Sequence, residues 1–152
     1  MSLVMTHNND AHDTPILSSA ERLFLQSALR AFSFLASDYG FSLRTQSAGV
    51  LCAESRHLVI RFILEYEGPH IEMERMRSIW AAIWGRKQAN CLSLYDVITR
   101  LAPNAQIRTE WGGGRDVYVP EAMIPEYFEY MGGLVRRYCS SFLEGRFDTW
   151  PG

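Results

Sequence analysis

The chain has 152 residues, of which 47% are hydrophobic and 21% charged, and its formal net charge at pH 7 is −2. This composition is near the globular average, which argues against a disordered or fibrous protein, and the length suits one domain with its own core. The near-neutral charge argues against nucleic-acid binding as the main function, because proteins with that function are usually basic.

The first residues form a polar leader. It lacks the basic and apolar regions of a signal peptide, and no later stretch approaches the ~20 apolar residues of a membrane span. We therefore expect a flexible leader over 1–17 and a single α+β domain over 18–152, located in the cytoplasm and not in a membrane. His7 and His12 are interpreted as part of this mobile tail and not as metal ligands.

The first expected element is an amphipathic helix over Ser19–Tyr39. Apolar side chains recur along it at helical spacing. Ser18 and Glu21 have the spacing of a capping box, and Gly40 supplies a stop signal at the other end.

The hydrophobic period then changes to two. Leu58–Tyr66 alternates clearly, and Phe41–Thr45, Val50–Glu54 and His70–Met76 are shorter candidates for strands. The turns between them are too short for parallel crossovers. The pattern predicts an antiparallel meander, giving a sheet of about four strands.

Two segments follow the strands. Ile79–Trp84 is apolar and aromatic, and its pattern fits either a short helix or a loop. Leu94–Leu101 is expected to be a helix, because Ser93 can cap its start and Pro103 lies just beyond its end.

The last expected element is a long helix over Glu121–Phe142. We expect it to be interrupted at Pro125, softened by the glycines at 132 and 133, and ended by Gly145. Together the elements predict an α+β fold in which the N-terminal and C-terminal helices pack on one face of the antiparallel sheet.

Four glutamates flank the predicted turn at Gly68 and Pro69. Pairing of the two strands would bring Glu65, Glu67, Glu72 and Glu74 onto one exposed end and face of the sheet. Three interpretations remain open: an ordinary solvated surface, an acidic docking surface for a basic protein, or a carboxylate site for a cation or acid–base chemistry.

Nucleophilic catalysis has little support in the sequence. His57 and His70 are the only histidines outside the leader, and both are expected at loop edges. The cysteines are odd in number and widely separated, without a CxxC pair, so we expect buried reduced thiols and neither a disulfide framework nor a zinc knuckle.

Trp111 and Arg115 flank three glycines. The Gly112–Gly114 run lacks the Lys-Ser/Thr of a P-loop and the strand-to-helix context of a dinucleotide fingerprint. The segment is either a plain flexible hairpin or a contact-forming tip, since Trp and Arg are favoured anchors of interfaces.

The order of these elements resembles a group of small bacterial proteins, some of which are immunity proteins of polymorphic toxin systems. The resemblance extends over most of residues 21–150. It rests on hydrophobic patterns: Phe34-Leu35, Tyr39-Gly40-Phe41, Leu94-Tyr95-Asp96-Val97-Ile98 with Pro103, and Phe142-Leu143-Glu144-Gly145-Arg146-Phe147 with Trp150. It implies the fold more than an activity, and it carries over no catalytic residues.

The resemblance and the acidic hairpin together predict a non-enzymatic inhibitor that neutralises a cognate protein toxin. We expect no cofactor, no metal, no catalytic residue and no nucleic-acid partner, and a homodimer is left open. The expected contact residues are Glu65, Glu67, Glu72, Glu74, Trp111 and Arg115.

Two other classes of function stay open. One is a small-ligand binding or adaptor domain with an apolar cleft lined by Trp80, Trp84 and Tyr127. The other is a metal-dependent or acid–base enzyme that uses the glutamates together with His70.

Overall fold

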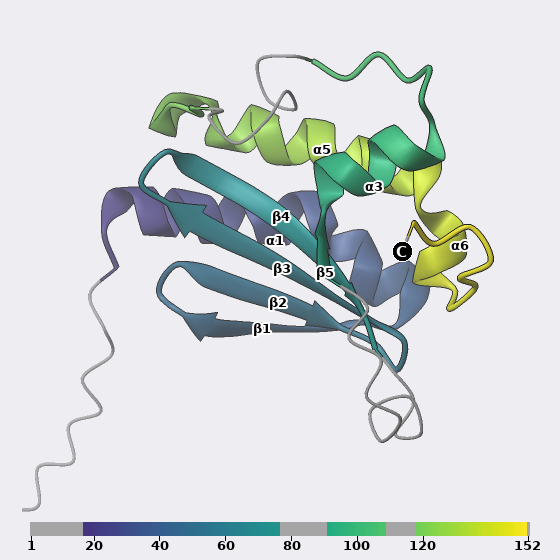
Figure 1. Cartoon of the computed structure of the whole chain (residues 1–152). Coiled ribbons are helices and arrows are strands. Elements are labelled where there is room, and N and C mark those ends of the chain that lie inside the picture. The colour runs from purple at the N-terminus through teal and green to yellow at the C-terminus, as the bar shows by residue number, and fades with distance from the viewer. Residues whose placement is uncertain (1–16, 77–90, 109–117, 152) are drawn as a thin grey trace, which may run out of the picture.

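The structure, a computed structural model, describes residues 17–76, 91–108 and 118–151. A five-stranded antiparallel sheet has the order β1-β2-β3-β4-β5, and α1 and α5 lie on one side of it (Figure 1). The predicted α+β class is confirmed, with five strands instead of about four. The elements are α1 (Ser19–Tyr39), β1 (Ser42–Ser47), β2 (Val50–Glu54), β3 (Leu58–Glu65), β4 (Gly68–Arg75), β5 (Cys91–Ser93), α3 (Leu94–Leu101), η1 (Glu121–Met123), α5 (Ile124–Tyr138) and α6 (Ser140–Leu143).

Helix α1 has the predicted bounds because both ends are fixed by local hydrogen bonds. The Ser18 hydroxyl accepts from the backbone N–H of Glu21 at 3.2 Å. At the other end Gly40 has a φ of 71°, and its N–H donates to the carbonyl of Ala36. A left-handed residue of this kind ends many helices, and glycine adopts the conformation without strain.

The sheet is a simple meander, and its two faces differ in polarity. The inner face, turned toward the helices, buries apolar side chains such as Leu51, Ile60, Phe62 and Met73. The fifth strand, β5, pairs with β4 through Glu72↔Ser93, Met73↔Leu92 and Glu74↔Cys91. It is only three residues long, too short to show an alternating pattern.

An aromatic cluster connects the two helices to the inner face of the sheet. Phe32 of α1 lies 4.6 Å from Phe62 of β3, measured between ring centroids. Phe128 of α5 lies 5.5 Å from Phe24 and 6.1 Å from Phe62. All four rings are fully buried, so this cluster forms the centre of the core.

The C-terminal helical region is in three pieces, and the predicted interruption at Pro125 is wrong, because Pro125 lies in the first turn of α5 and the break falls at Cys139. The 3₁₀ turn η1 precedes α5, whose first turn contains Pro125, and the chain leaves the helix at Cys139 before α6. Cys139 is buried, with φ −107° and ψ 8°. The break lets α6 turn so that Phe142 and Leu143 enter the core.

The glycines at 132 and 133 do not interrupt α5, although a softening was predicted there. Gly132 is buried at the point where α5 crosses α1, and an added Cβ would lie 3.0 Å from the backbone oxygen of Ala31. The missing side chain allows the two backbones to approach. Gly133 faces open space.

The chain ends in a second aromatic cluster beside α6. Phe142 stacks on Phe147 at 5.8 Å, and Trp150 meets Phe142 at 5.1 Å. The guanidinium of Arg75 lies 4.7 Å from the centre of the Phe147 ring.

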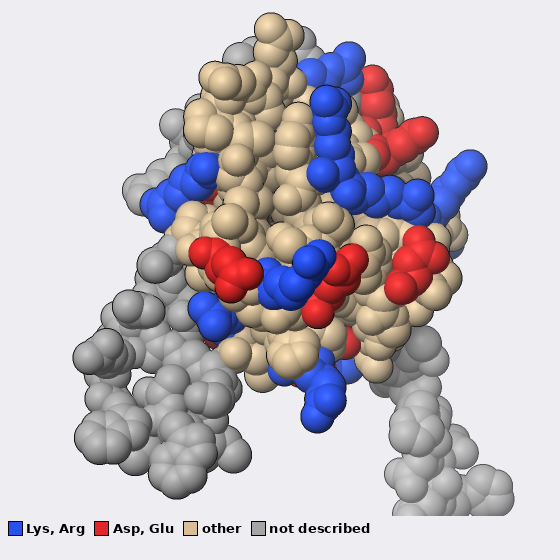
Figure 2. Space-filling model, turned by 90° about the vertical axis from the view of Figure 1, so that its right-hand side faces the viewer, with Lys and Arg blue, Asp and Glu red and all other residues tan. Residues whose placement is uncertain are grey.

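Figure 2, which views the molecule from the end that carries α6, shows positive and negative side chains next to one another. This end therefore offers no extended surface of one charge sign among the residues coloured there.

Three of the predicted segments cannot be compared with the structure. Residues 1–16 of the predicted leader, the Ile79–Trp84 segment and the Trp111–Arg115 segment lie outside the described residues. In the described parts, none of the helices has both the length and the apolar character that a membrane crossing requires.

Candidate functional site

The side of the sheet turned away from α1 and α5 is called the outer face. The strand register fixes its members, because directly paired residues share a face. Arg44, Cys52, Arg61 and Glu72 form one row across four strands. The outer face includes Ser42, Arg44, Val50, Cys52, Glu54, Val59, Arg61, Ile63, Glu65, His70, Glu72, Glu74, Cys91 and Ser93.

The register places three of the four predicted glutamates on this face. Glu65 lies at the end of β3, while Glu72 and Glu74 alternate along β4. Glu67 lies in the two-residue turn, where its carbonyl accepts from the N–H of Val119 at 2.9 Å. Its exposed side chain therefore stands at the end of the outer face rather than on it.

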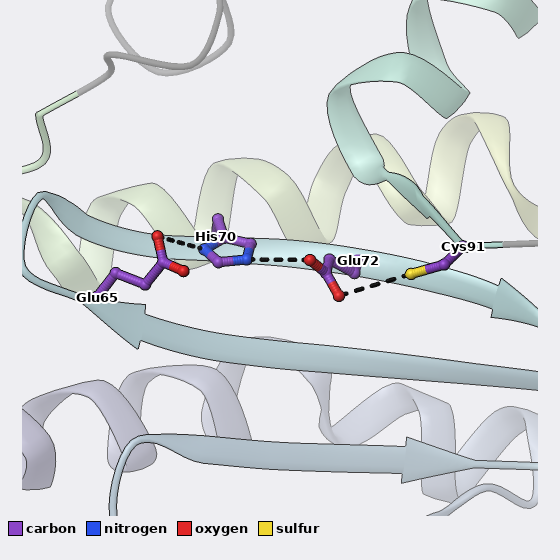
Figure 3. A network of polar contacts seen from close by, with 4 residues as sticks. All are labelled: Glu65, His70, Glu72 and Cys91. Atoms are coloured by element: carbon purple, nitrogen blue, oxygen red, sulfur yellow. Dashed lines mark hydrogen bonds and ion pairs between the residues drawn. The ribbon is translucent and has the colours of Figure 1, made fainter. Parts of the chain in front are cut away.

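A chain of polar contacts runs along β4 from the turn to β5 (Figure 3). Glu65 Oε2 lies 3.5 Å from His70 Nδ1, and His70 Nε2 lies 3.3 Å from Glu72 Oε1. The other oxygen of Glu72 accepts from the Cys91 thiol at 3.6 Å. The pairing of His70 with Glu72 is present, and it is about one third exposed rather than fully solvated.

The imidazole of His70 lies between two carboxylates. A neutral imidazole carries one N–H, so it donates to only one of them, while an imidazolium donates to both. In its neutral form His70 adds no positive charge to the outer face. Glu65 and Glu72 then contribute their full negative charge.

Glu74 differs from the other glutamates because it has an arginine partner. Arg61 Nη2 lies 2.6 Å from Glu74 Oε2, and this hydrogen bond raises the pKa of Arg61 above its ordinary value. Arg44 pairs with Glu54 at 3.7 Å on the neighbouring strands. The two arginines of the outer face are thus both engaged by carboxylates.

Cys91 was expected to be buried, and this expectation is wrong. Cys52 and Cys139 are buried, but Cys91 is exposed because β5 is an edge strand and presents this residue on the outer face. Partial desolvation of the sulfur raises the pKa of the Cys91 thiol, and the nearby Glu72 and Glu74 carboxylates raise it further. The thiol is therefore a hydrogen-bond donor to Glu72 and a poor nucleophile.

Alkylation tests this description of Cys91. At pH 7.5 we expect iodoacetamide to modify Cys91 several-fold more slowly than free cysteine, because a raised pKa reduces the thiolate fraction. Glu72→Gln removes one carboxylate that raises the pKa, so the rate should increase. Glu67→Gln changes the same charge away from the sulfur and should leave the rate unaltered. A slower reaction in Glu72→Gln would contradict the assignment; mass spectrometry of the modified peptide gives the rate.

The described residues bear on two parts of the other expected sites, the metal centre and the position of Tyr127 in an apolar cleft. Within these residues, no group of three or more His, Cys, Asp and Glu side chains is arranged to hold a metal ion. Tyr127, expected to line an apolar cleft, is 3% exposed and packs edge-on against Phe128, and its burial raises its pKa. Trp80, Trp84, Trp111 and Arg115 lie outside the described residues.

Sequence reasoning did not identify two members of the site. Arg61 stands at an outward position of the alternating strand β3, so its face could have been inferred, but its choice of Glu74 as partner could not. Cys91 had no such signal, because β5 itself was not predicted.

Comparison of this chain with protein-family models, with curated proteins and with solved structures finds no match. The resemblance to immunity proteins stays an expectation from the sequence pattern. The charges and geometry of the outer face are the basis for inferring a function.

Proposed function

We propose that the chain is a non-catalytic protein-binding protein of the immunity type, which binds a basic surface of a toxin through its outer face. The supporting observation is that Glu65, Glu67 and Glu72 form no ion pair with any arginine of the described residues. Glu65 and Glu67 lie at the β3–β4 turn, and Glu72 lies farther along β4, connected to Glu65 through His70, so the three carboxylates give one part of the sheet negative charge. Trp111 and Arg115 remain proposed anchors.

The charge distribution favours a basic partner. Arg44 and Arg61 are engaged by Glu54 and Glu74, which leaves the remaining carboxylates of the outer face as its net charge. An exposed group of like charges accelerates encounter with an oppositely charged protein and discriminates against acidic ones. An inhibitor needs such a surface, of roughly 800 Å² per partner, and no chemistry of its own.

The environment of Cys91 argues against nucleophilic catalysis by this thiol. Cys91 is the only exposed thiol of the chain, and its raised pKa disfavours the thiolate that nucleophilic catalysis requires. Glu72 accepts from the thiol instead of activating it, because its negative charge further disfavours ionisation of the sulfur. The polar contacts of the outer face therefore order the carboxylates.

The test is a charge reversal at the two most peripheral carboxylates, Glu65→Lys with Glu67→Lys. A partner is first captured from lysate of the source organism with the wild-type protein, identified by mass spectrometry and purified. We expect the double variant to bind this partner about tenfold or more weakly, mainly through a slower association rate, and the difference to shrink at high salt. Surface plasmon resonance measures both rates.

The matched control makes the same change in net charge on α1 and α5, the helices on the other side of the sheet. Asp38→Lys with Glu129→Lys alters exposed residues of α1 and α5, away from the outer face. The control should bind within about twofold of the wild type, since a distant charge acts only through a screened field. Equal weakening in both double variants would show an effect of net charge alone, and no weakening in either would remove the outer face from the interface.

A further inference from the structure

A groove runs between α1 and α5, on the opposite side of the molecule from the outer face of the sheet. The two helices lie side by side and run in the same direction (Figure 1). The groove has a volume of about 420 Å³. It is lined by Leu23, Gln26, Ser27, Arg30 and Ala31 from α1 and by Pro125 and Glu129 from α5.

The shape of the groove follows from the packing of the helices. At Gly132 the backbones of α5 and α1 approach closely, because no side chain separates them from Ala31. Toward the start of α5 the lining side chains are small or compact, with Ser27, Ala31 and Pro125 facing the space. Its volume falls within the ~300–1,000 Å³ that small-molecule sites occupy.

The groove combines apolar walls with two opposite charges. Arg30 and Glu129 come from different helices and line the same space. Neither takes part in an ion pair, either with the other or with any further residue in the described parts of the chain. Leu23 and Pro125 supply apolar surface, and Ser27 is a polar residue that is only 8% exposed.

We propose that this groove binds a small zwitterion of the free amino-acid class. The guanidinium of Arg30 would bind the carboxylate of the ligand, and Glu129 would bind its ammonium group. An apolar ligand side chain would lie against Leu23 and Pro125. A ligand with a single charge would pair with either Arg30 or Glu129 and would be repelled by the other residue, which carries the same sign of charge as the ligand. The two residues together therefore select a zwitterion. This inference is independent of the function proposed for the outer face.

The experiment uses the full chain and L-leucine as the probe, followed by ¹H–¹⁵N NMR. We expect saturable shifts of the backbone amides of Ser27 and Ala31. N-acetyl-L-leucine lacks the ammonium group and L-leucinamide lacks the carboxylate, and each should bind about tenfold more weakly than L-leucine. Arg30→Gln and Glu129→Gln should produce losses of the same size, because each removes one charge-assisted contact.

The control variant is Arg22→Gln, which removes an exposed arginine from α1 that does not line the groove. It should bind L-leucine as the wild type does. The proposal is overturned if the shifts do not saturate in the millimolar range, or if both charge analogues bind as well as L-leucine. It is equally overturned if Arg30→Gln and Arg22→Gln have the same effect, since that would indicate a general response to charge. The spectra themselves report whether each variant is folded.

Discussion

Replacing Phe128 by alanine is expected to lower the free energy of unfolding by roughly 3–5 kcal/mol, the cost typical of emptying a buried aromatic site. The Phe128 ring is fully buried and contacts three rings from two other elements, Phe24 and Phe32 on α1 and Phe62 on β3. Its removal opens a cavity where the helices meet the sheet. The surrounding rings belong to different elements and cannot all move inward, so the cavity persists.

Urea unfolding followed by circular dichroism measures the change. The control is Tyr66→Ala, because Tyr66 is 100% exposed in the β3–β4 turn and its removal should change the unfolding free energy by no more than about 0.5 kcal/mol. A loss for Phe128→Ala as small as that of Tyr66→Ala would mean that the aromatic cluster is not the centre of the core. Since whole domains have only about 5–15 kcal/mol of stability, Phe128→Ala should show a clearly lower urea midpoint.

The elements that could be predicted from sequence are those set by local signals. The bounds of α1 follow from a cap at Ser18 and a glycine stop at Gly40, both of which act within a few residues. Strand β2 and helix α3 were also predicted with the bounds that the structure shows. In each case the hydrophobic period and the flanking residues predict the same type of element with the same bounds.

The features that were missed depend on contacts between distant segments. The break at Cys139 arises because α6 turns its side chains into the core, and no Pro or Gly marks the position. Strand β5 exists because three residues pair with β4, across a long stretch of chain. Neither event has a local signature, so tertiary packing decides both.

In the candidate site, too, local patterns predicted some features while contacts between side chains decided others. Alternation along β3 and β4 was enough to predict that Glu65, Glu72 and Glu74 share one face, since a strand's side chains alternate between the two sides. It was not enough to predict which of them would be neutralised. Arg61 lies directly opposite Glu72 in the register but forms its ion pair with Glu74, a diagonal neighbour. Only side-chain geometry decides whether Arg61 pairs with Glu72 or with Glu74.

Replacing Gly132 by valine is expected to lower the free energy of unfolding by about 3 kcal/mol, at the upper end of the cost of overpacking. A Cβ at this position would already lie 3.0 Å from the carbonyl oxygen of Ala31, and that atom is backbone. It cannot turn aside as the end of a flexible side chain could. The added methyl groups must therefore separate α1 from α5, which would also disturb the Phe24–Phe128 contact.

The neighbouring glycine provides the matched control. Gly133 lies in the same helix, is exposed and has nothing within 4 Å of the position of an added Cβ. Gly133→Ala should therefore raise the unfolding free energy by about 0.5–1 kcal/mol, because alanine restricts the unfolded chain and favours the helix. Opposite signs at adjacent positions, measured by urea unfolding, would show that packing decides the effect at 132 and helix propensity at 133. A stabilised Gly132→Val variant would mean that the two helices are not held at the distance that defines both the core and the groove.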